Sequence, residues 1–353
     1  MATESRRLIA EACRGPRPGR TPIFDILAND RVIEHFAGRP LDGATDRETS
    51  TLASVKALDG TRHIYVPDVE GRTWRDEVGN LHVASRWTQW IHERAITDVG
   101  GWVKWIGAHI GRLEAQAPPT DAERAACAAE QWAYLDTLNG MVYMHCTPST
   151  AINYAMFVYC GLEFFSYLWA DNRALAQRWL RALEGEQRRY VRLVAHPENC
   201  DLAMIYSDVA FKGRLMFSPE MFREMGFFED VAAICAQCHA MGIRVIFHSD
   251  GYIMDIMADL VAAGIDGVNP IEKAAGMDVY ELRRRYPELI LVGGVDVSHL
   301  LPFGTPAEVR SETRRIIDET GSEGRLLIGT STELDAGVPP ENYLAFHDEA
   351  MRG

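Results

Sequence analysis

Short apolar runs alternate with helix-like segments through the second half of the chain. The runs are rich in β-branched residues and end at polar or glycine residues, which is typical of buried parallel strands. They lie at 202–206, 242–248, 266–269, 289–294 and 325–329. Because the segments between them are long enough to cross over and return in the same direction, the pattern predicts successive βα units.

Helix start and stop signals support these units. A helix is predicted over 218–241, since Ser218 suits the N-cap, Pro219 suits the first helical position and Gly242 suits the end. Further helices are predicted over 253–263 and 278–286, from Thr305 and from Pro340 onward.

The first 139 residues follow this rhythm less regularly. Strands are predicted at 22–27 and 140–145, an extended hairpin at 63–83, and helices at 87–105 and 121–134. We therefore predict an α/β protein: one (β/α)8 TIM-barrel domain over 1–353, with a helical and hairpin elaboration in 1–139 and regular βα units in 140–353.

Composition narrows the class of protein. The 353 residues carry a formal net charge of −14, which argues against nucleic acid or an anionic membrane as the main partner. No apolar stretch approaches the ~20 residues of a membrane span, and no signal-peptide pattern opens the sequence. The seven cysteines are expected to be reduced thiols in a cytoplasmic protein, with Cys235 and Cys238 packed in a helix.

His248-Ser249-Asp250-Gly251 is the strongest candidate for chemistry. This stretch follows a predicted strand, and the carboxyl ends of parallel strands are where α/β proteins hold their sites. Asp208 and Asp296 each end another predicted strand. We assign His248, Asp250 and Asp208 as candidate catalytic residues. Two of these have a structural alternative: a buried, hydrogen-bonded imidazole for His248 and a turn-capping carboxylate for Asp250. Asp296 could likewise cap the helical turn that begins at Ser298.

Several ordered segments resemble the uroporphyrinogen decarboxylase superfamily, which includes porphyrinogen decarboxylases and corrinoid-linked methyltransferases. The resemblance extends from about Gly140 to the C-terminus and is poor before it. The matching segments are 161–165 with Asp171, 207–208, 217–220, 245–251, 263–272, 293–296 and 339–342.

The porphyrinogen decarboxylases so resembled carry an Arg-Gln-Ala-Gly-Arg segment after the first strand, which pairs with substrate carboxylates. This chain has Asp-Ile-Leu-Ala-Asn-Asp-Arg at 25–31 instead. A substrate with many carboxylates needs cations, so the resemblance favours the methyltransferase branch, and within it the demethylases of aromatic methyl ethers.

The resemblance also implies zinc. Family methyltransferases use a His-x-Cys pair, a cysteine from the last strand and, in related enzymes, a glutamate. Here the corresponding residues are His248, Asp250 and Glu272, with Thr330 or Ser331 as weaker candidates, and no cysteine follows Cys238. Nitrogen and oxygen ligands suit an oxygen-containing substrate better than a thiol.

The implied function is methyl transfer from a small methoxylated, aromatic substrate to a corrinoid. The corrinoid would arrive on a separate protein, because the chain lacks an Asp-x-His-x-x-Gly segment. Candidate substrate-binding residues are Asp25, Tyr206, Lys212, Asp296 and His145. Aromatic residues that could wall the pocket, or equally pack in the core, are Tyr65, Trp87, Trp90, Trp102 and Trp105.

Two other functions stay open at this point. One is a metal-free decarboxylase or lyase in which Asp208, His248 and Asp250 handle protons. The other is a ligand-binding relative without catalysis. The sequence is compatible with a homodimer and does not identify the oligomeric state.

Overall fold

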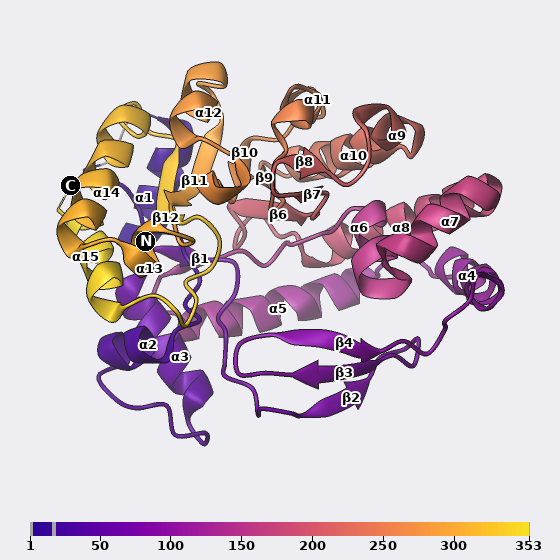
Figure 1. The fold of residues 1–353 in the computed structure, drawn as a ribbon, viewed down its shortest axis with the longest axis horizontal. Helices are drawn as coiled ribbons and strands as arrows, with labels where there is room; N and C mark the ends of the chain where they lie inside the picture. The colour runs from indigo at the N-terminus through magenta and orange to yellow at the C-terminus, as the bar shows by residue number, and fades with distance from the viewer. Residues whose placement is uncertain (1–2, 16–18, 353) are drawn as a thin grey trace.

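A computed structural model describes residues 3–15 and 19–352. Parallel strands gather at the centre of one α/β assembly, helices pack around them, and a separate antiparallel sheet lies to one side (Figure 1). No helix in the described ranges is long and apolar enough to cross a membrane.

The main sheet contains the five strands predicted in the second half of the chain. All neighbouring pairs are parallel, and the strand order is β12-β11-β10-β9-β6. Their bounds are β6 Leu202–Tyr206, β9 Arg244–His248, β10 Gly267–Asn269, β11 Ile290–Val295 and β12 Leu326–Thr330. The predicted βα rhythm is confirmed here.

A two-stranded parallel sheet of β1 (Gly60–Thr61) and β5 (Val142–Tyr143) comes from the first half. Single parallel bridges, Ile23 to Ile328, Phe24 to Gly60 and Cys146 to Ala203, link it to the main sheet. The predicted strand at 22–27 is thus reduced to isolated bridges. Among the described residues, continuous strand ladders do not close into a barrel.

The helices before the main sheet are α1 Glu4–Arg14, α2 Asp30–Ala37, α3 Asp46–Ala57, α4 Val99–Glu114, α5 Asp121–Thr137, α6 Ala151–Asn153, a π-helix over Tyr154–Tyr159, α7 Gly161–Asp171 and α8 Arg173–Val194. Those that follow β6 are α9 Pro219–Glu224, α10 Phe227–His239, α11 Met257–Ala262, α12 Val279–Arg285, α13 Leu300–Phe303, α14 Pro306–Thr320 and α15 Pro340–Ala350. Two single 3-10 turns, Met254–Ile256 and Lys273–Ala275, complete the set.

Two predicted helices differ in the structure. The helix expected over 218–241 is two helices, α9 and α10, because Gly226 adopts a left-handed φ of 76° between them. The helix expected over 87–105 begins only at Val99, with Asp98 as its N-cap.

The start of that segment forms β4 (Gln89–Glu93) instead, beside β3 (Leu81–Ala84) and β2 (Thr73–Arg75). The predicted hairpin is therefore part of a three-stranded antiparallel sheet. Trp90 lies opposite Val83 in this sheet, and cross-strand pairing of aromatic and β-branched side chains outweighs the helical spacing of the tryptophans.

The main strands bury both of their faces. Met204 and Ile246 belong to a core inside the curved sheet, whereas their neighbours Ile205 and Phe247 belong to the larger core beneath the helices. Side chains alternate along a strand with a period of two. The next positions on the inner side, at the carboxyl ends, are therefore Tyr206 and His248.

Asp230 connects the helical layer to these strand ends. Its Oδ2 accepts a hydrogen bond from the Ala151 N–H at 2.8 Å, at the start of α6. The adjacent Thr150 hydroxyl lies 2.6 Å from the Ser207 hydroxyl, and Asn153 Oδ1 accepts the Asp208 N–H at 3.0 Å. Burial raises the pKa of Asp230 to about 7, so its charged form opposes folding.

We predict that Asp230→Asn flattens the pH dependence of stability. A carboxyl whose folded pKa is raised from 3.8 to about 7 stabilises the fold fully below pH 4, and this contribution, ~4 kcal/mol, is lost as the pH rises through 7. The asparagine keeps the acceptor for Ala151 without the charge. The melting temperature of the wild type should fall by several degrees more than that of Asp230→Asn between pH 5 and pH 8.

The exposed Asp136→Asn variant is the control and should follow the wild type. Parallel losses in wild type and Asp230→Asn would show that Asp230 carries no such penalty.

Candidate functional site

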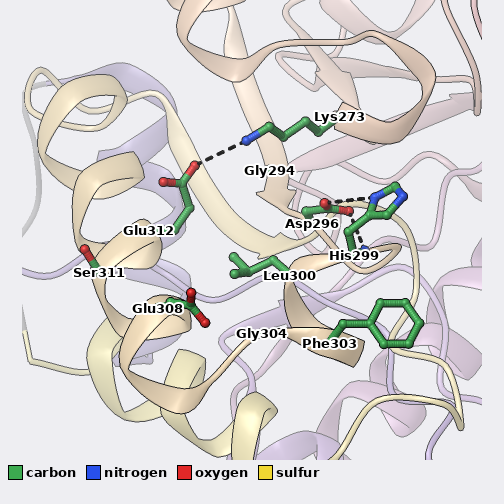
Figure 2. Close-up of a pocket in the computed structure, with 10 residues that line it drawn as sticks. All are labelled: Lys273, Gly294, Asp296, His299, Leu300, Phe303, Gly304, Glu308, Ser311 and Glu312. Carbon is green, nitrogen blue, oxygen red and sulfur yellow. Dashed lines mark hydrogen bonds and ion pairs between the residues drawn. The ribbon is translucent and has the colours of Figure 1, made fainter.

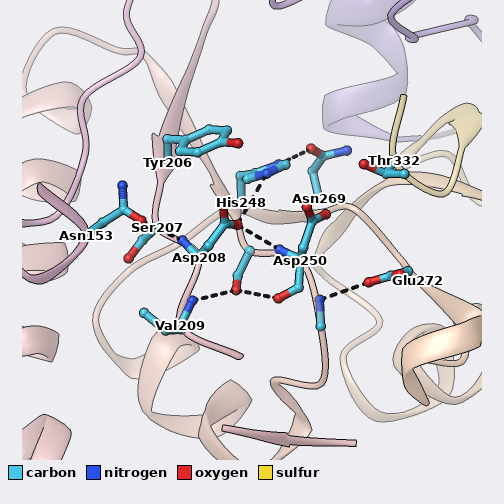
Figure 3. A network of polar contacts seen from close by, with 12 residues as sticks. Asn153, Tyr206, Ser207, Asp208, Val209, His248, Asp250, Asn269, Glu272 and Thr332 are labelled. Atoms are coloured by element: carbon cyan, nitrogen blue, oxygen red, sulfur yellow. Dashed lines mark hydrogen bonds and ion pairs between the residues drawn. The ribbon is translucent and has the colours of Figure 1, made fainter. Parts of the chain in front are cut away.

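Asp208, His248 and Asp250 meet at the carboxyl ends of β6 and β9. One potential ligand atom from each lies within 4.8 Å of those of the others (Figure 3). Period-two alternation explains the grouping, because His248 and Asp250 are two residues apart, as are Tyr206 and Asp208. The structure thus brings together all three residues that the sequence predicts as catalytic.

His248 has one ring nitrogen bound and one free. Its Nδ1 lies 2.7 Å from Asn269 Oδ1, and the Asn269 amide nitrogen donates to the Val292 carbonyl at 3.2 Å. This second bond orients the amide, so Nδ1 is the donor and Nε2 carries the lone pair. Nε2 is buried without a hydrogen-bond partner, 3.7 Å from Asp208 Oδ1.

The surroundings keep this imidazole neutral. His248 is 1% exposed and stacks on the Tyr206 ring, with centroids 4.3 Å apart. Burial, reinforced by the nearby Arg62 charge, lowers the pKa of His248 to about 3. A neutral imidazole with a free nitrogen is the form that binds a metal or accepts a proton.

The two aspartates are held close together despite their like charge. Asp208 Oδ1 accepts the Asp250 N–H at 3.0 Å. Burial raises the pKa of Asp208, and burial followed by repulsion from Asp208 and Glu272 raises the pKa of Asp250 to about 7. Asp250 Oδ1 is buried and unpartnered. Both unsatisfied atoms of the group are therefore free to bind a ligand.

A tight turn fixes the position of Asp250. The Ser249 hydroxyl accepts the Val209 N–H at 3.1 Å and donates to the Asp250 carbonyl at 2.9 Å. Gly251 has a φ of 88°, and a Cβ there would lie 2.8 Å from the Phe211 carbonyl oxygen, so only glycine fits. The Gly251 N–H donates to Glu272 Oε2 at 3.0 Å. Glu272 thus holds this turn and is outside the cluster of free ligand atoms.

Arg62 is a site residue that the sequence reasoning missed. It follows β1, its side chain is 15% exposed, and its guanidinium lies over the Tyr206 ring at 5.2 Å. Its strand is only two residues long, and the hairpin predicted from the sequence begins only at residue 63, so Arg62 belongs to no predicted element. The signal in the sequence that could have indicated this site residue is an arginine directly after Gly60–Thr61.

A small cavity connects Arg62 to His248. Its volume is about 10 Å³, room for roughly one water-sized group. Its wall consists of Phe24, Asp25, Ile26, Arg62, His248, Asn269, Thr330 and Thr332.

Asp25 lines this cavity but is already engaged. Its carboxylate accepts the Thr330 N–H at 3.1 Å and the Thr330 hydroxyl at 2.7 Å, and burial raises its pKa to about 7. The Ser331 hydroxyl accepts the Val297 N–H at 3.1 Å. Thr330 and Ser331, the weaker metal candidates, therefore hold strand ends together.

Three other predicted substrate-binding residues, His145, Lys212 and Asp296, do not belong to the cluster of Asp208, His248 and Asp250. His145 packs beside Tyr134 and Tyr143. Lys212 is exposed, between the short strands β7 (Ala210–Phe211) and β8 (Arg214–Leu215).

Asp296 accepts the Ser298 and His299 N–H groups at 2.8 and 3.2 Å, the capping role weighed for it from the sequence. It lines a different cavity of about 570 Å³ beside α13 and α14 (Figure 2). Of the candidate aromatic wall, Trp102 is buried in the helical core and Trp90 is 47% exposed.

Comparison with known proteins identifies the family. The family model described as uroporphyrinogen decarboxylase (URO-D) matches residues 151–352, more than half of the chain. The chain belongs to the URO-D family. Its strand-end cluster of Asp208, His248 and Asp250 lies inside the matched region. No curated protein matches the chain.

Comparison with solved structures gives one match that supports the fold and one weak match. A methyltransferase from Methanosarcina mazei matches with a TM-score of 0.67 and 15% sequence identity, over 99% of each chain. A xylose isomerase domain protein from Alicyclobacillus acidocaldarius matches with a TM-score of 0.35 and 14% identity, over 71% of this chain and 84% of the other. At this identity, the first match establishes a shared fold.

We predict that Asn269 determines the tautomer of His248. Asn269→Ala removes the acceptor for Nδ1–H, a hydrogen bond of ~1 kcal/mol, so the ratio of the two neutral tautomers should shift several-fold. Nitrogen-15 NMR of the ring at pH 7, without added metal, would report this shift. Asn269→Asp retains an acceptor and should retain the wild-type tautomer. An unchanged ring spectrum in Asn269→Ala would contradict the assignment.

Proposed function

We propose that this URO-D family chain is a methyltransferase. It would take the methyl group from a small methoxylated substrate and pass it to a corrinoid on a separate protein. The observation that carries the proposal is the Asp208–His248–Asp250 cluster, with its buried, unpartnered Nε2 and Oδ1 atoms. The fold shared with a methyltransferase supports it.

We further propose that the architecture is a (β/α)8 barrel. The single bridges from Ile23, Phe24 and Cys146 continue the parallel order from β12 through β1 and β5 back to β6. The cluster would then lie at the carboxyl-end mouth, where barrel enzymes carry out their chemistry.

The residues present fit a divalent metal. His248 Nε2 and the carboxylates of Asp208 and Asp250 would hold Zn²⁺, with Asp208 in place of the Glu272 expected from the sequence. Bound there, the cation supplies electrophilic polarisation of an ether oxygen. The carboxylates offset its charge. Asn269 accepts the hydrogen bond from His248 Nδ1, and such a bond to the nitrogen that does not bind the metal orients the imidazole.

The protein's own groups account for the rest of the reaction. The carbon–oxygen bond of the ether would break, the methyl group would go to the reduced corrinoid, and the departing oxygen would take up a proton from solvent. Stacking on Tyr206 prevents the His248 ring from turning. His248 is buried and the two aspartates are partly buried, which limits the water that would otherwise screen the charge that develops on that oxygen.

One observation favours a second candidate, a metal-free decarboxylase. Asp250, with a pKa of about 7, can carry a proton, and Arg62 can hold a carboxylate. The charge balance favours the first candidate. Asp208 and Asp250 lie beside a neutral histidine, with Glu272 close to Asp250, and these acidic groups outnumber the nearby Arg62 cation and attract a further cation.

The metal proposal predicts one tightly bound Zn²⁺ per chain. His248→Ala and Asp250→Asn should each weaken binding by at least about 100-fold, because each removes a ligand. Equilibrium dialysis followed by elemental analysis measures this. His299→Ala, an exposed histidine, should bind like wild type. Wild-type protein that takes up no zinc would overturn the metal site.

The reaction proposal predicts formation of methylated corrinoid from methoxylated substrates. His248→Ala should lower the rate by about 10²–10³-fold, with His299→Ala unchanged. Absorbance of the corrinoid follows the reaction, and released CO2 is measured in parallel. Release of CO2 without corrinoid methylation would establish the decarboxylase instead. Ligand binding with neither product would identify a non-catalytic protein.

A further inference from the structure

Arg62 has none of the close partners that a structural arginine has. In residues 3–15 and 19–352 its side chain makes no hydrogen bond, and its ion pair with Glu333 is long, at 3.9 Å. Arg20 provides a contrast within the same protein. It forms two bonds to the buried Asp59, at 2.6 and 2.8 Å. The guanidinium of Arg62 therefore keeps its hydrogen-bonding capacity for another partner.

The position of Arg62 is nevertheless well defined. Its guanidinium rests on the Tyr206 ring, which in turn stacks on His248. A stacked guanidinium keeps the N–H groups at its edge available, and their planar fork matches a carboxylate. Arg62 and His248 line the same small cavity, so the guanidinium and the imidazole face a common space. Because this space holds only about one water-sized group, a substrate that contacts both residues has to widen it.

We propose that Arg62 binds a carboxylate of the substrate and that this carboxylate displaces Glu333. The inference rests on the proposed function and specifies its substrate class: small molecules with a methyl ether and a carboxylate. The carboxylate binds on the Arg62 side, and the ether oxygen lies toward His248, Asp208 and Asp250.

The charges around the site explain why an arginine is needed. Asp208, Asp250 and Glu333 repel an approaching anion, and Arg62 is the cation placed among them. Glu333 is 37% exposed, so it can turn to solvent when a substrate carboxylate takes its place. Arg62 follows β1, whereas the resembled decarboxylases carry their arginine segment after the first strand, where this chain has 25–31.

Paired ligands that differ only in charge test this inference. Binding of 4-methoxybenzoate and 4-methoxybenzamide, and of methoxyacetate and methoxyacetamide, is measured by calorimetry on zinc-supplemented full-length protein. Wild type should prefer the carboxylate by about tenfold or more in at least one pair, as expected for a hydrogen bond between charged groups.

Two substitutions should change this preference in opposite directions. Arg62→Gln should abolish it, and Glu333→Gln should increase it several-fold, because a competing anion is removed. Arg39→Gln, a change at an exposed arginine, should leave it unchanged. Where Arg62→Gln does not fold, Arg62→Lys keeps the charge without the fork and should reduce the preference.

Three outcomes would overturn the inference: no carboxylate preference in either wild-type pair, a preference that persists in Arg62→Gln, or a preference that Glu333→Gln weakens. A preference that depends on Arg62, in a protein that never methylates corrinoid, would reject the proposed function and leave the carboxylate site standing. Equal methyl transfer from the acid and its amide would reject only the carboxylate site.

Discussion

His248 is buried, and Asp208 and Asp250 are partly buried, at the ends of β6 and β9, and much of the surrounding structure serves to hold them there. Burial opposes the charged forms of all three, so the pKa values of the aspartates rise and that of the histidine falls. Two polar atoms in the cluster, His248 Nε2 and Asp250 Oδ1, remain without partners. Such atoms destabilise a fold, and their presence together at a strand end is typical of a site that gains its partner from a ligand.

The supporting contacts come from several elements. Asn153 binds the Asp208 N–H from α6, Asn269 fixes the His248 ring from β10, and Ser249 ties the β9 turn to Val209. Asp230 anchors the start of α6 from the helical layer, although its burial there opposes its charged form. These groups preorganise the site, because no side chain of the cluster has to find its position when a ligand arrives.

The chain belongs to the URO-D family, and two features distinguish the site proposed for it. The resemblance pairs Asp250 with a cysteine of the methyltransferases, and the cluster of His248, Asp208 and Asp250 offers oxygen and nitrogen donors. Arg62, which directly follows β1, adds a cation. Together they support an oxygen-containing, anionic substrate, in contrast to a thiol or a porphyrin.

The sequence by itself determined the βα rhythm of the second half and the strand-end positions of Asp208, His248 and Asp250. These features depend on local periodicity and on glycine and proline signals, which short-range sterics control. Only the tertiary structure decided the partners. Asp208 joins the cluster, whereas Glu272 binds the Gly251 N–H. Arg62, which follows a two-residue strand, lies over the Tyr206 ring. Residues 89–93 form a strand in place of the predicted helix. Each of these outcomes depends on contacts between segments far apart in the chain, which no local pattern encodes.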